Sequence, residues 1–303
     1  MKVLIFGATG FIGSHLVKSK LLPDHEVCVV SRRPKEARKK FDNKVDALGW
    51  KGKVTPELQE KVEWADAIIN LAGENLAKLW TSKAKKRIEK SRLNLGFAVA
   101  ELINNAKNKP GTVIQASAVG YYGSDPSASF NEDSAPGKGF LADVTDKWED
   151  SLDEIRDEHV RKVYLRSGIV LGKEGGMLPK IKIPMKLYVG GHIGNGKQWM
   201  SWIHIEDEVR AIHFLLEHTE LKGPFNLTSP NPVQQKEFTS ALGRAMNRPS
   251  WFPVPSFILK LFLGDMADEM LLASQRVIPD KLLDAGFEFS YTNIDDAFRD
   301  LTK

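Results

Sequence analysis

Residues 3–13 read VLIFGATGFIG, and this stretch decides the fold. The apolar run Val3–Phe6 predicts a buried strand, and glycines follow it at positions 7, 10 and 13. Apolar residues at helical spacing then predict a helix over Phe11–Leu22. Glycines between a strand and a helix allow a tight turn, a close approach of the backbone to a pyrophosphate, and close packing of the helix on the sheet.

This turn is predicted to bind the phosphates of a dinucleotide. The helix N-terminus offers unpaired N–H groups and the positive end of a dipole. The residues expected to contact the cofactor here are Gly7, Thr9, Gly10, Phe11, Ile12 and Gly13. The alternative is a glycine-rich turn that binds no ligand.

Further strands and helices alternate through the first two thirds of the chain. We expect strands over 27–30, 67–71, 113–116 and 163–166, and helices over 82–104, 145–155 and 207–217. Apolar strands that alternate with helices favour a parallel sheet covered on both faces. The predicted fold class is therefore α/β, a Rossmann-type doubly wound parallel sheet.

Glycine and proline clusters after about residue 171 indicate a change of organisation. The segments GKEGGMLPK, YVGGHIGNGKQ and RPSWFPVPS are typical of loops. We expect residues 1–228 to form an NADP-binding Rossmann domain, with 174–200 looping toward a second unit. Residues 229–303 are expected to form a small C-terminal lobe on the substrate side.

Basic residues after the second strand distinguish between two cofactors. An NAD site usually carries Asp or Glu about 20 residues past the glycines. Here the strand ends in Ser31-Arg32-Arg33, and six of the nine residues from 32 to 40 are basic. A guanidinium can bind a 2′-phosphate through paired hydrogen bonds. The sequence therefore predicts NADP(H), bound by Ser31, Arg32 and Arg33, with the charges at 38–40 facing solvent; the alternative is a solvated basic loop.

Composition excludes several classes of protein. The chain has 303 residues, of which 42% are hydrophobic and 27% charged, a net charge of +4 and one cysteine. These values exclude a largely disordered chain, a disulfide framework and a cysteine-built zinc site. We expect a cytoplasmic protein with a small-molecule substrate, without a metal, a nucleic-acid partner or a membrane partner, and with a homodimer left open.

Several segments resemble the atypical, epimerase-family group of extended short-chain dehydrogenase/reductases. They are NLAGENLAKLW, SAVGYYG, FLADVTDKWE, RSGIVLGKEGGMLPK, GKQWMSWIHIEDEVRAI and the tail RPSWFPVPS…RVIPDKLLDAGFEF. The resemblance runs nearly end to end and includes the small C-terminal domain of unknown function found in that group. It implies a nicotinamide cofactor that is contacted by Leu71, Ala72 and Gly73, by Arg92, and by Val170 at the nicotinamide end.

The proton relay of ordinary members is missing. Those members use Tyr-x-x-x-Lys, but none of the five tyrosines here is followed by lysine four residues later. Alignment on the helix that contains Trp148 puts Leu141 and Thr145 near the expected positions. The resemblance leaves Ser117 to bind a substrate carbonyl. Tyr121 or Tyr122 is a candidate replacement acid, with its pKa lowered by Arg92; the alternative is that both tyrosines only pack in a loop.

Two functions follow from these residues. The first is an NADP(H)-dependent oxidoreductase or epimerase-like enzyme that passes a hydride to or from a substrate carbon near Ser117. The second is a catalytically silent NADP(H)-binding sensor or regulatory protein.

Overall fold

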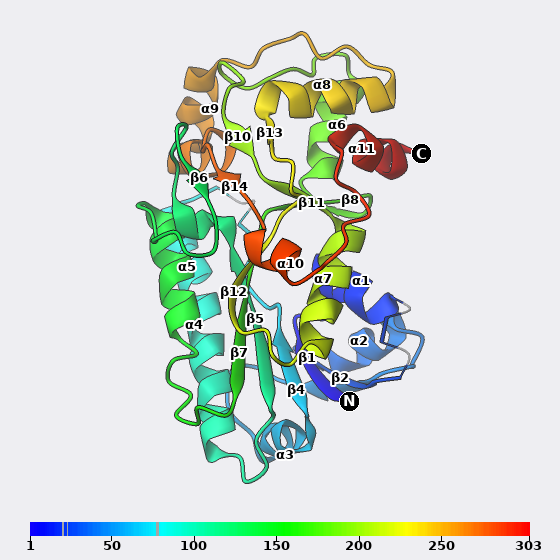
Figure 1. The fold of residues 1–303 in the computed structure, drawn as a ribbon, viewed down its shortest axis with the longest axis vertical. Helices are drawn as coiled ribbons and strands as arrows, with labels where there is room; N and C mark the ends of the chain where they lie inside the picture. Colours follow the sequence, from blue (N-terminus) through cyan, green and yellow to red (C-terminus); the bar gives the residue numbers. More distant parts are fainter. Residues whose placement is uncertain (20, 23, 77–78) are drawn as a thin grey trace.

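Seven parallel strands form the central sheet of the computed structural model, which describes residues 1–19, 21–22, 24–76 and 79–303 (Figure 1). Their order is β12 (Gly223–Leu227), β7 (Arg161–Ser167), β5 (Thr112–Ala118), β4 (Ala67–Asn70), β1 (Lys2–Phe6), β2 (Glu26–Ser31) and β3 (Asp46–Gly49). The chain builds outward from β1 to β3 and then continues on the other side with β4. The sheet is therefore doubly wound, as predicted, and its switch point lies between β1 and β4.

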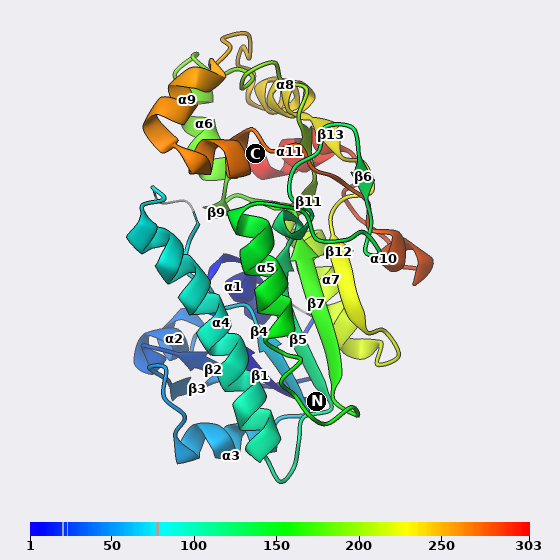
Figure 2. The ribbon, with the colours of Figure 1, turned by 90° about the vertical axis from the view of Figure 1, so that its left-hand side faces the viewer.

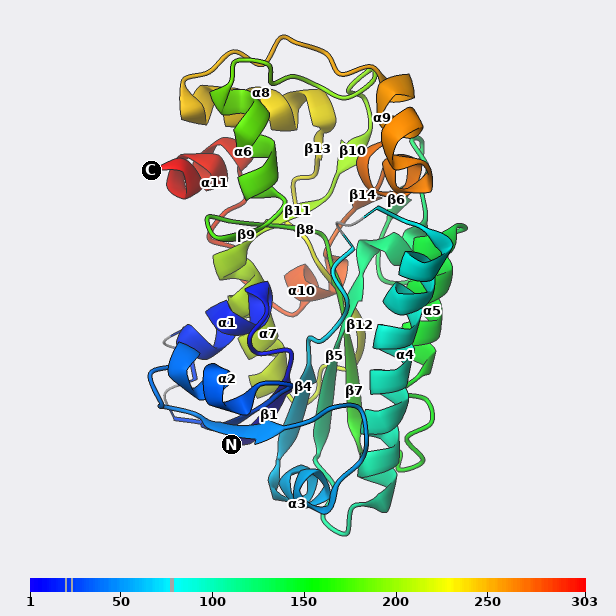
Figure 3. The same cartoon turned by 180° about the vertical axis from the view of Figure 1, so that it is seen from behind.

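Helices cover both faces of this sheet (Figures 2 and 3). In β1, Val3 and Ile5 pack in one apolar cluster and Leu4 and Phe6 in another, because successive side chains of a strand point to opposite faces. The first cluster includes residues of α1 (Phe11–Lys18), α2 (Pro34–Lys40) and α7 (Ile205–Glu217). The second includes residues of α3 (Pro56–Trp64) and α4 (Ser82–Asn105), which lies beside α5 (Phe140–Asp150).

The glycine turn after β1 depends on missing side chains. Gly7 has φ +77°, and a Cβ there would lie 2.6 Å from the carbonyl carbon of Leu71. A Cβ on Gly13 would lie 2.6 Å from the carbonyl oxygen of Gly7. The turn after β1 thus fits tightly between α1 and the end of β4.

A smaller lobe lies beyond the carboxyl ends of the sheet strands (Figure 1). Its helices are α6 (Leu178–Lys186), α8 (Gln235–Met246), α9 (Ser256–Leu263), α10 (Asp280–Asp284), which packs on β12, and α11 (Ile294–Thr302). Its short strands are β6 (Ser129–Phe130), β8 (Ile169–Gly172), β9 (Gly175–Gly176), β10 (Trp199–Met200), β11 (Trp202–His204), β13 (Val233–Gln234) and β14 (Arg276–Val277). Trp202, Phe238 and Phe298 meet in its core, so chain segments from both sides of residue 229 build it. Within the described residues, no helix combines the length and apolar character needed to cross a bilayer.

Several predicted boundaries were wrong. The helix predicted over 145–155 begins at Phe140 and ends at Asp150. The helix predicted from Phe11 to Leu22 ends at Lys18, and Lys20 lies outside the described residues. The basic stretch after residue 33 forms α2, and α6 begins inside a predicted loop. β3 and β12 were missed because each is short or contains residues of low strand propensity.

The early start of α5 has a physical cause in the other lobe. The two carboxylate oxygens of Glu269 accept hydrogen bonds from the backbone N–H groups of Phe140 (3.1 Å) and Leu141 (2.8 Å). A carboxylate at a helix N-terminus satisfies unpaired donors and complements the helix dipole. Glu269 therefore caps α5 and ties it to the lobe.

Glu269→Ala should lower the free energy of unfolding by about 1–2 kcal/mol, because it removes a charged cap. Urea denaturation checks this value. The matched control is Asp268→Ala, which removes an exposed pair with Lys260 and should cost less than about 1 kcal/mol. Equal losses in the two variants would contradict the capping role.

A carboxyl group is buried under α7. Glu208 is fully buried, and one of its oxygens accepts a 2.6 Å hydrogen bond from Ser167 Oγ. Its other oxygen has no hydrogen-bond partner among the described residues. Burial raises the pKa of Glu208 to about 8, and the Ser167 bond offsets only part of this increase. The group is therefore protonated in the folded protein at neutral pH.

This raised pKa predicts a pH dependence of stability. The contribution of Glu208 is fully present below the unfolded pKa of about 4.5, and it declines as the pH rises toward about 8. Glu208→Gln should remove this decline, whose slope is at most about 1.4 kcal/mol per pH unit. Urea denaturation between pH 5 and 8 measures it. Glu206→Gln, an exposed neighbour on α7, should retain the wild-type slope; a wild-type slope in Glu208→Gln would refute the assignment.

Candidate cofactor and substrate site

A cavity of about 670 Å³ opens at the switch point of the sheet. The ends of β1, β2 and β4 and one face of α4 line it. The predicted cofactor residues in its wall are Gly7, Thr9, Gly10, Ser31, Arg32, Leu71, Ala72 and Gly73. The structure thus brings together residues from three separate predicted segments at the edge where open α/β sheets bind ligands.

The N-terminus of α1 carries no capping side chain. Gly10 is the N-cap, has no side chain that could cap the helix, and is followed by a first turn without acidic residues. The early N–H groups of the helix are thereby left for an anion. The ring of Phe11 packs instead under β8 and β9, where a Cβ on Gly175 would lie 2.3 Å from it. Phe11 and Ile12 can therefore meet a phosphate only through their backbone.

A second cavity, of about 640 Å³, adjoins the first. Thr9, Ser31 and Arg32 line both cavities. Arg33 lines the second and lies 3.2 Å from Glu36, while the backbone N–H of Arg33 donates to Ser31 Oγ (3.1 Å). This arrangement places two guanidinium groups beside the hydroxyl that ends β2.

Lys40 also lines this second cavity. Its Nζ donates to the carbonyl oxygen of Thr9 at 2.8 Å. The sequence predicted a solvent-facing charge there, and the side chain is exposed, but α2 points it back over the glycine turn. Lys40 therefore adds a third cation to the Ser31–Arg33 corner.

One face of α4 contributes residues that the sequence analysis did not select. Arg87, Lys90, Ser91 and Asn94 line the larger cavity, at spacings that share one helix face. The basic stretch at 83–90 was interpreted as a solvated surface; Lys83 and Lys86 are exposed, but Lys85 pairs with Asp265 at 2.6 Å. The feature of the sequence that could have identified these residues is the helical spacing of 87, 90, 91 and 94 in the helix that follows a predicted strand.

A buried polar network lies at the ends of β5 and β7. Ser117 Oγ donates to Glu149 Oε1 at 2.6 Å. Arg166 donates to both oxygens of Glu149, from Nε at 2.9 Å and from Nη2 at 2.8 Å. The paired carboxylate raises the pKa of Arg166 despite the opposing effect of burial. Sequence analysis proposed Ser117 but not the ion pair behind it, whose two members lie on α5 and β7.

The two candidate tyrosines have different environments. Tyr122 is 2% exposed, and its hydroxyl donates to Asn226 Oδ1 (2.7 Å) and accepts from Arg166 Nη1 (3.0 Å). Tyr121 is only partly buried, and the Arg166 guanidinium carbon lies 3.5 Å from its ring centroid. Burial raises the pKa of both phenols, that of Tyr122 to about 12, against the lowering effect of Arg166. Both side chains therefore stay protonated at neutral pH.

Arg92 lies elsewhere. Its Nη1 donates to the carbonyl oxygens of Ile88 (3.1 Å) and Glu74 (3.3 Å), and its guanidinium lies over Trp148. Burial lowers its pKa to about 10. A Cβ on Gly73 would lie 3.3 Å from this guanidinium, so Arg92 backs the cavity wall at Gly73. The cation in contact with the tyrosines is Arg166 and not the predicted Arg92.

The other residues named from the sequence are apolar, or their polar group is hydrogen-bonded within its own helix. Val170 is partly buried on β8 and packs on the core cluster of the α1 face. Leu141 packs on Gly120, and Thr145 Oγ1 donates to the carbonyl oxygen of Leu141 at 2.5 Å. The positions of the usual tyrosine and lysine thus carry no titratable group. Ala77 and Lys78, within the quoted segment NLAGENLAKLW, lie outside the described residues.

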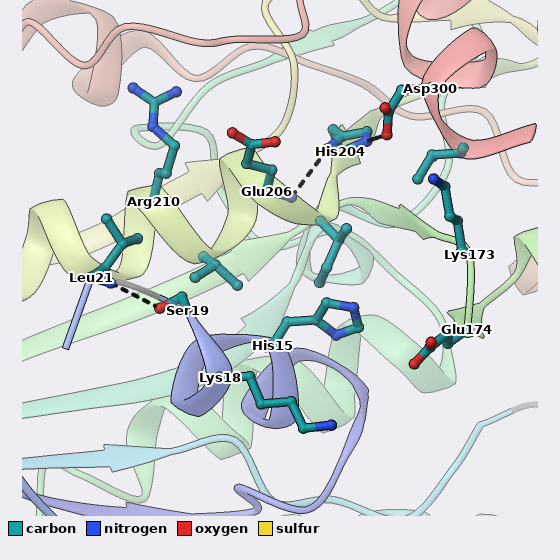
Figure 4. A pocket seen from close by; sticks show the side chains of 13 residues that line it. His15, Lys18, Ser19, Leu21, Lys173, Glu174, His204, Glu206, Arg210 and Asp300 are labelled. Atoms are coloured by element: carbon teal, nitrogen blue, oxygen red, sulfur yellow. Dashed lines mark hydrogen bonds and ion pairs between the residues drawn. The ribbon is translucent and has the colours of Figure 1, made fainter. Parts of the chain in front are cut away.

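Another cavity, of about 650 Å³, lies between α1, α7 and α11 (Figure 4). His204 lines it, but this ring is buried and its Nδ1 accepts a hydrogen bond from the backbone of Glu206 at 3.1 Å. The ring stacks on Tyr291 (3.8 Å between centroids), and Nε2 lies 3.5 Å from Asp300. These contacts give His204 a structural role, as the N-cap of α7.

Comparisons with known families identify the chain. A model described as the NAD dependent epimerase/dehydratase family matches residues 3–228, and one described as a domain of unknown function (DUF1731) matches 254–301. The epimerase family protein YfhF of Bacillus subtilis is 39% identical over 99% of this chain and 98% of its own length. The chloroplastic SDR39U1 homolog of Arabidopsis thaliana is 39% identical over 99% of this chain and 86% of its own length.

Solved structures of epimerase-family proteins also superpose on this chain. The human epimerase family protein SDR39U1, solved with NADPH, superposes with a TM-score of 0.87 at 30% identity, covering 100% of this chain and 99% of that one. UDP-glucuronic acid 4-epimerase of Bacillus cereus superposes with a TM-score of 0.80 at 16% identity, covering 100% and 99%, and shows the shared fold. These findings confirm the resemblance read from the sequence. The protein belongs to the NAD dependent epimerase/dehydratase family.

Proposed function

We propose that this protein is an NADP(H)-dependent, epimerase-like oxidoreductase that reduces or oxidises a small carbonyl or alcohol substrate. The observation that carries the proposal is the pair of adjoining cavities that share Thr9, Ser31 and Arg32. One has the size and glycine-lined wall that an adenosine pyrophosphate requires. The other is lined by Arg32, Arg33 and Lys40, which suit an additional phosphate. The human relative solved with NADPH supports the phosphorylated form.

Different residues of the chain would hold different parts of such a cofactor. The N-terminus of α1 would hold the pyrophosphate, and Ser31 with Arg32 and Arg33 would hold the 2′-phosphate. Leu71, Ala72 and Gly73 would border the adenosine side, and Val170 the opposite end. When bound, a nicotinamide supplies or accepts a hydride.

Tyr121 is the stronger candidate for proton transfer. Its phenol is partly exposed beside Arg166, whereas the hydroxyl of Tyr122 is already bonded on both sides. Because burial raises the pKa of Tyr121, the phenol is protonated at neutral pH and suits an acid. In reduction, Tyr121 would protonate the alkoxide oxygen that hydride addition leaves on the substrate, and solvent water would return a proton to the phenolate. Ser117 would bind the same substrate oxygen by turning its hydroxyl hydrogen away from Glu149, to which it donates in this structure.

A second function is favoured by one observation. The usual tyrosine and lysine positions carry Leu141 and Thr145, and the Ser117 hydroxyl is committed to Glu149 at 2.6 Å. A protein that binds NADP(H) and reports its level without turnover needs no more than the cofactor cavities. A screen of NADPH oxidation with sugar nucleotides, aldehydes and quinones separates the two functions, because a sensor oxidises none of them.

Arg32→Ala should weaken NADPH binding by about tenfold or more and leave NADH binding nearly unchanged, because it removes a charged hydrogen-bond donor to the 2′-phosphate alone. Titration by nicotinamide fluorescence, with thermal shift, measures both affinities.

Lys39→Ala is the matched control for Arg32→Ala. It removes an exposed cation of the same segment that lines neither cavity, and it should keep the wild-type preference. Equal losses for NADPH and NADH in Arg32→Ala would rule out 2′-phosphate recognition at this corner.

Tyr121→Phe should reduce turnover by about 100-fold or more on any carbonyl compound that the wild type reduces, with NADPH affinity unchanged. Tyr122→Phe should instead retain turnover and lower the free energy of unfolding by about 1–3 kcal/mol, because Asn226 and Arg166 lose a buried partner. Steady-state kinetics and urea denaturation of both variants test the assignment. Wild-type turnover in Tyr121→Phe would refute it.

A further inference from the structure

Two histidines and a glutamate meet on the face of the sheet covered by α1 and α7, in a cluster that none of the foregoing functions uses. His213 and Glu217 are one turn apart on α7, and His25 immediately precedes β2. Each residue offers one ligand atom, and these atoms lie within 4.8 Å of one another. His25 Nε2 lies 3.0 Å from Glu217 Oε1, and the two imidazole centroids are 5.9 Å apart.

The two rings are prepared for a ligand in different ways. His213 is partly buried on α7 and lines a cavity beside the cluster. The His25 side chain is 9% exposed, and its Nδ1 has no hydrogen-bond partner among the described residues.

Access and charge also suit a cation. Glu217 is exposed on its side chain, so it can rotate toward the two rings, and it brings the negative charge. A cavity of about 380 Å³ adjoins the cluster and leaves room for water. Its lining includes Leu21, His213 and Glu217, together with Arg210, whose guanidinium pairs with Asp207. Tetrahedral zinc bound to imidazole nitrogen and carboxylate oxygen has bonds of about 2.0–2.2 Å, which places its ligands roughly 3.4 Å apart. Small side-chain rotations would close the cluster to that spacing.

We propose that His25, His213 and Glu217 bind a divalent transition-metal ion of the zinc class, with water as the fourth ligand. Two imidazoles and one carboxylate are a common ligand set for this ion. The ion would fasten the segment that joins α1 to β2 onto α7. It would lie away from both cofactor cavities, so its expected effect is on stability and not on hydride transfer. The sequence analysis expected no metal, although His213 and Glu217 have the i, i+4 spacing of a helical metal-ligand pair.

The test is zinc binding by the full chain after treatment with EDTA. Competition with a chromophoric chelator gives affinity and stoichiometry, and Co²⁺ in place of Zn²⁺ reports tetrahedral ligation through its visible spectrum. The wild type should bind one ion per chain, and Zn²⁺ should raise its Tm. Glu217→Gln and His213→Gln should weaken binding by about tenfold or more and abolish the rise in Tm. His159→Gln, the control, alters an exposed histidine outside the cluster and should behave as wild type.

Three results would overturn the proposal. They are the absence of stoichiometric binding by the wild type, wild-type affinity in Glu217→Gln, and an equal loss of affinity in His159→Gln. Because Glu217 is exposed, Glu217→Gln should fold normally, so the test does not depend on the half-buried His213.

Discussion

The contact between the backbone of Gly7 and the end of β4 is the constraint on which the rest of the site depends. At this contact the chain leaves β1 so close to Leu71 and Ala72 that no side chain fits between them. The same turn lets α1 start where its free N–H groups face the cavity, and it sets α1 against the sheet through Gly13. The N-terminus of α1, the cavity wall at Leu71–Gly73 and the packing of α1 on the sheet are therefore one geometric arrangement.

A second constraint governs the substrate side. The buried pair of Glu149 and Arg166 holds Ser117 on one side and Tyr122 on the other. Removing one member of such a pair strands a buried charge, at a cost of about 3–5 kcal/mol. In this chain the ion pair supplies the rigidity and the positive charge beside the strand ends, while the helix positions of the usual proton relay are filled by Leu141 and Thr145. Among the residues of this network, the polar groups therefore come from the β5 side, where Ser117 and the two tyrosines lie, and not from the helix positions of the usual relay.

Local patterns in the sequence predicted much of the fold and some of the cavity. The turn from β1 to α1 was predictable because strand, glycines and helix are contiguous, and so were the Ser31–Arg33 corner and the parallel sheet. Interactions between distant residues were not. The start of α5 is set by Glu269, 129 residues from Phe140. Arg166 is the partner of the tyrosines because β5 and β7 are neighbours in the sheet, and the sequence alone does not predict that these two strands pair. Lys40 reaches Thr9 only because residues 34–40 fold as a helix.

The core of the small lobe is built from chain segments on both sides of β12 in the sequence, and this affects the order of folding. Its core joins Trp202, which precedes the edge strand β12, with Phe238 and Phe298, which follow it. During synthesis, the segment carrying α6 and Trp202 emerges before the sheet has its last strand and long before α11 exists. The apolar residues of this segment are then exposed to water until the later helices of the lobe have been made. The lobe therefore completes its core only after the edge strand of the sheet has been made, although part of the lobe precedes that strand in the chain.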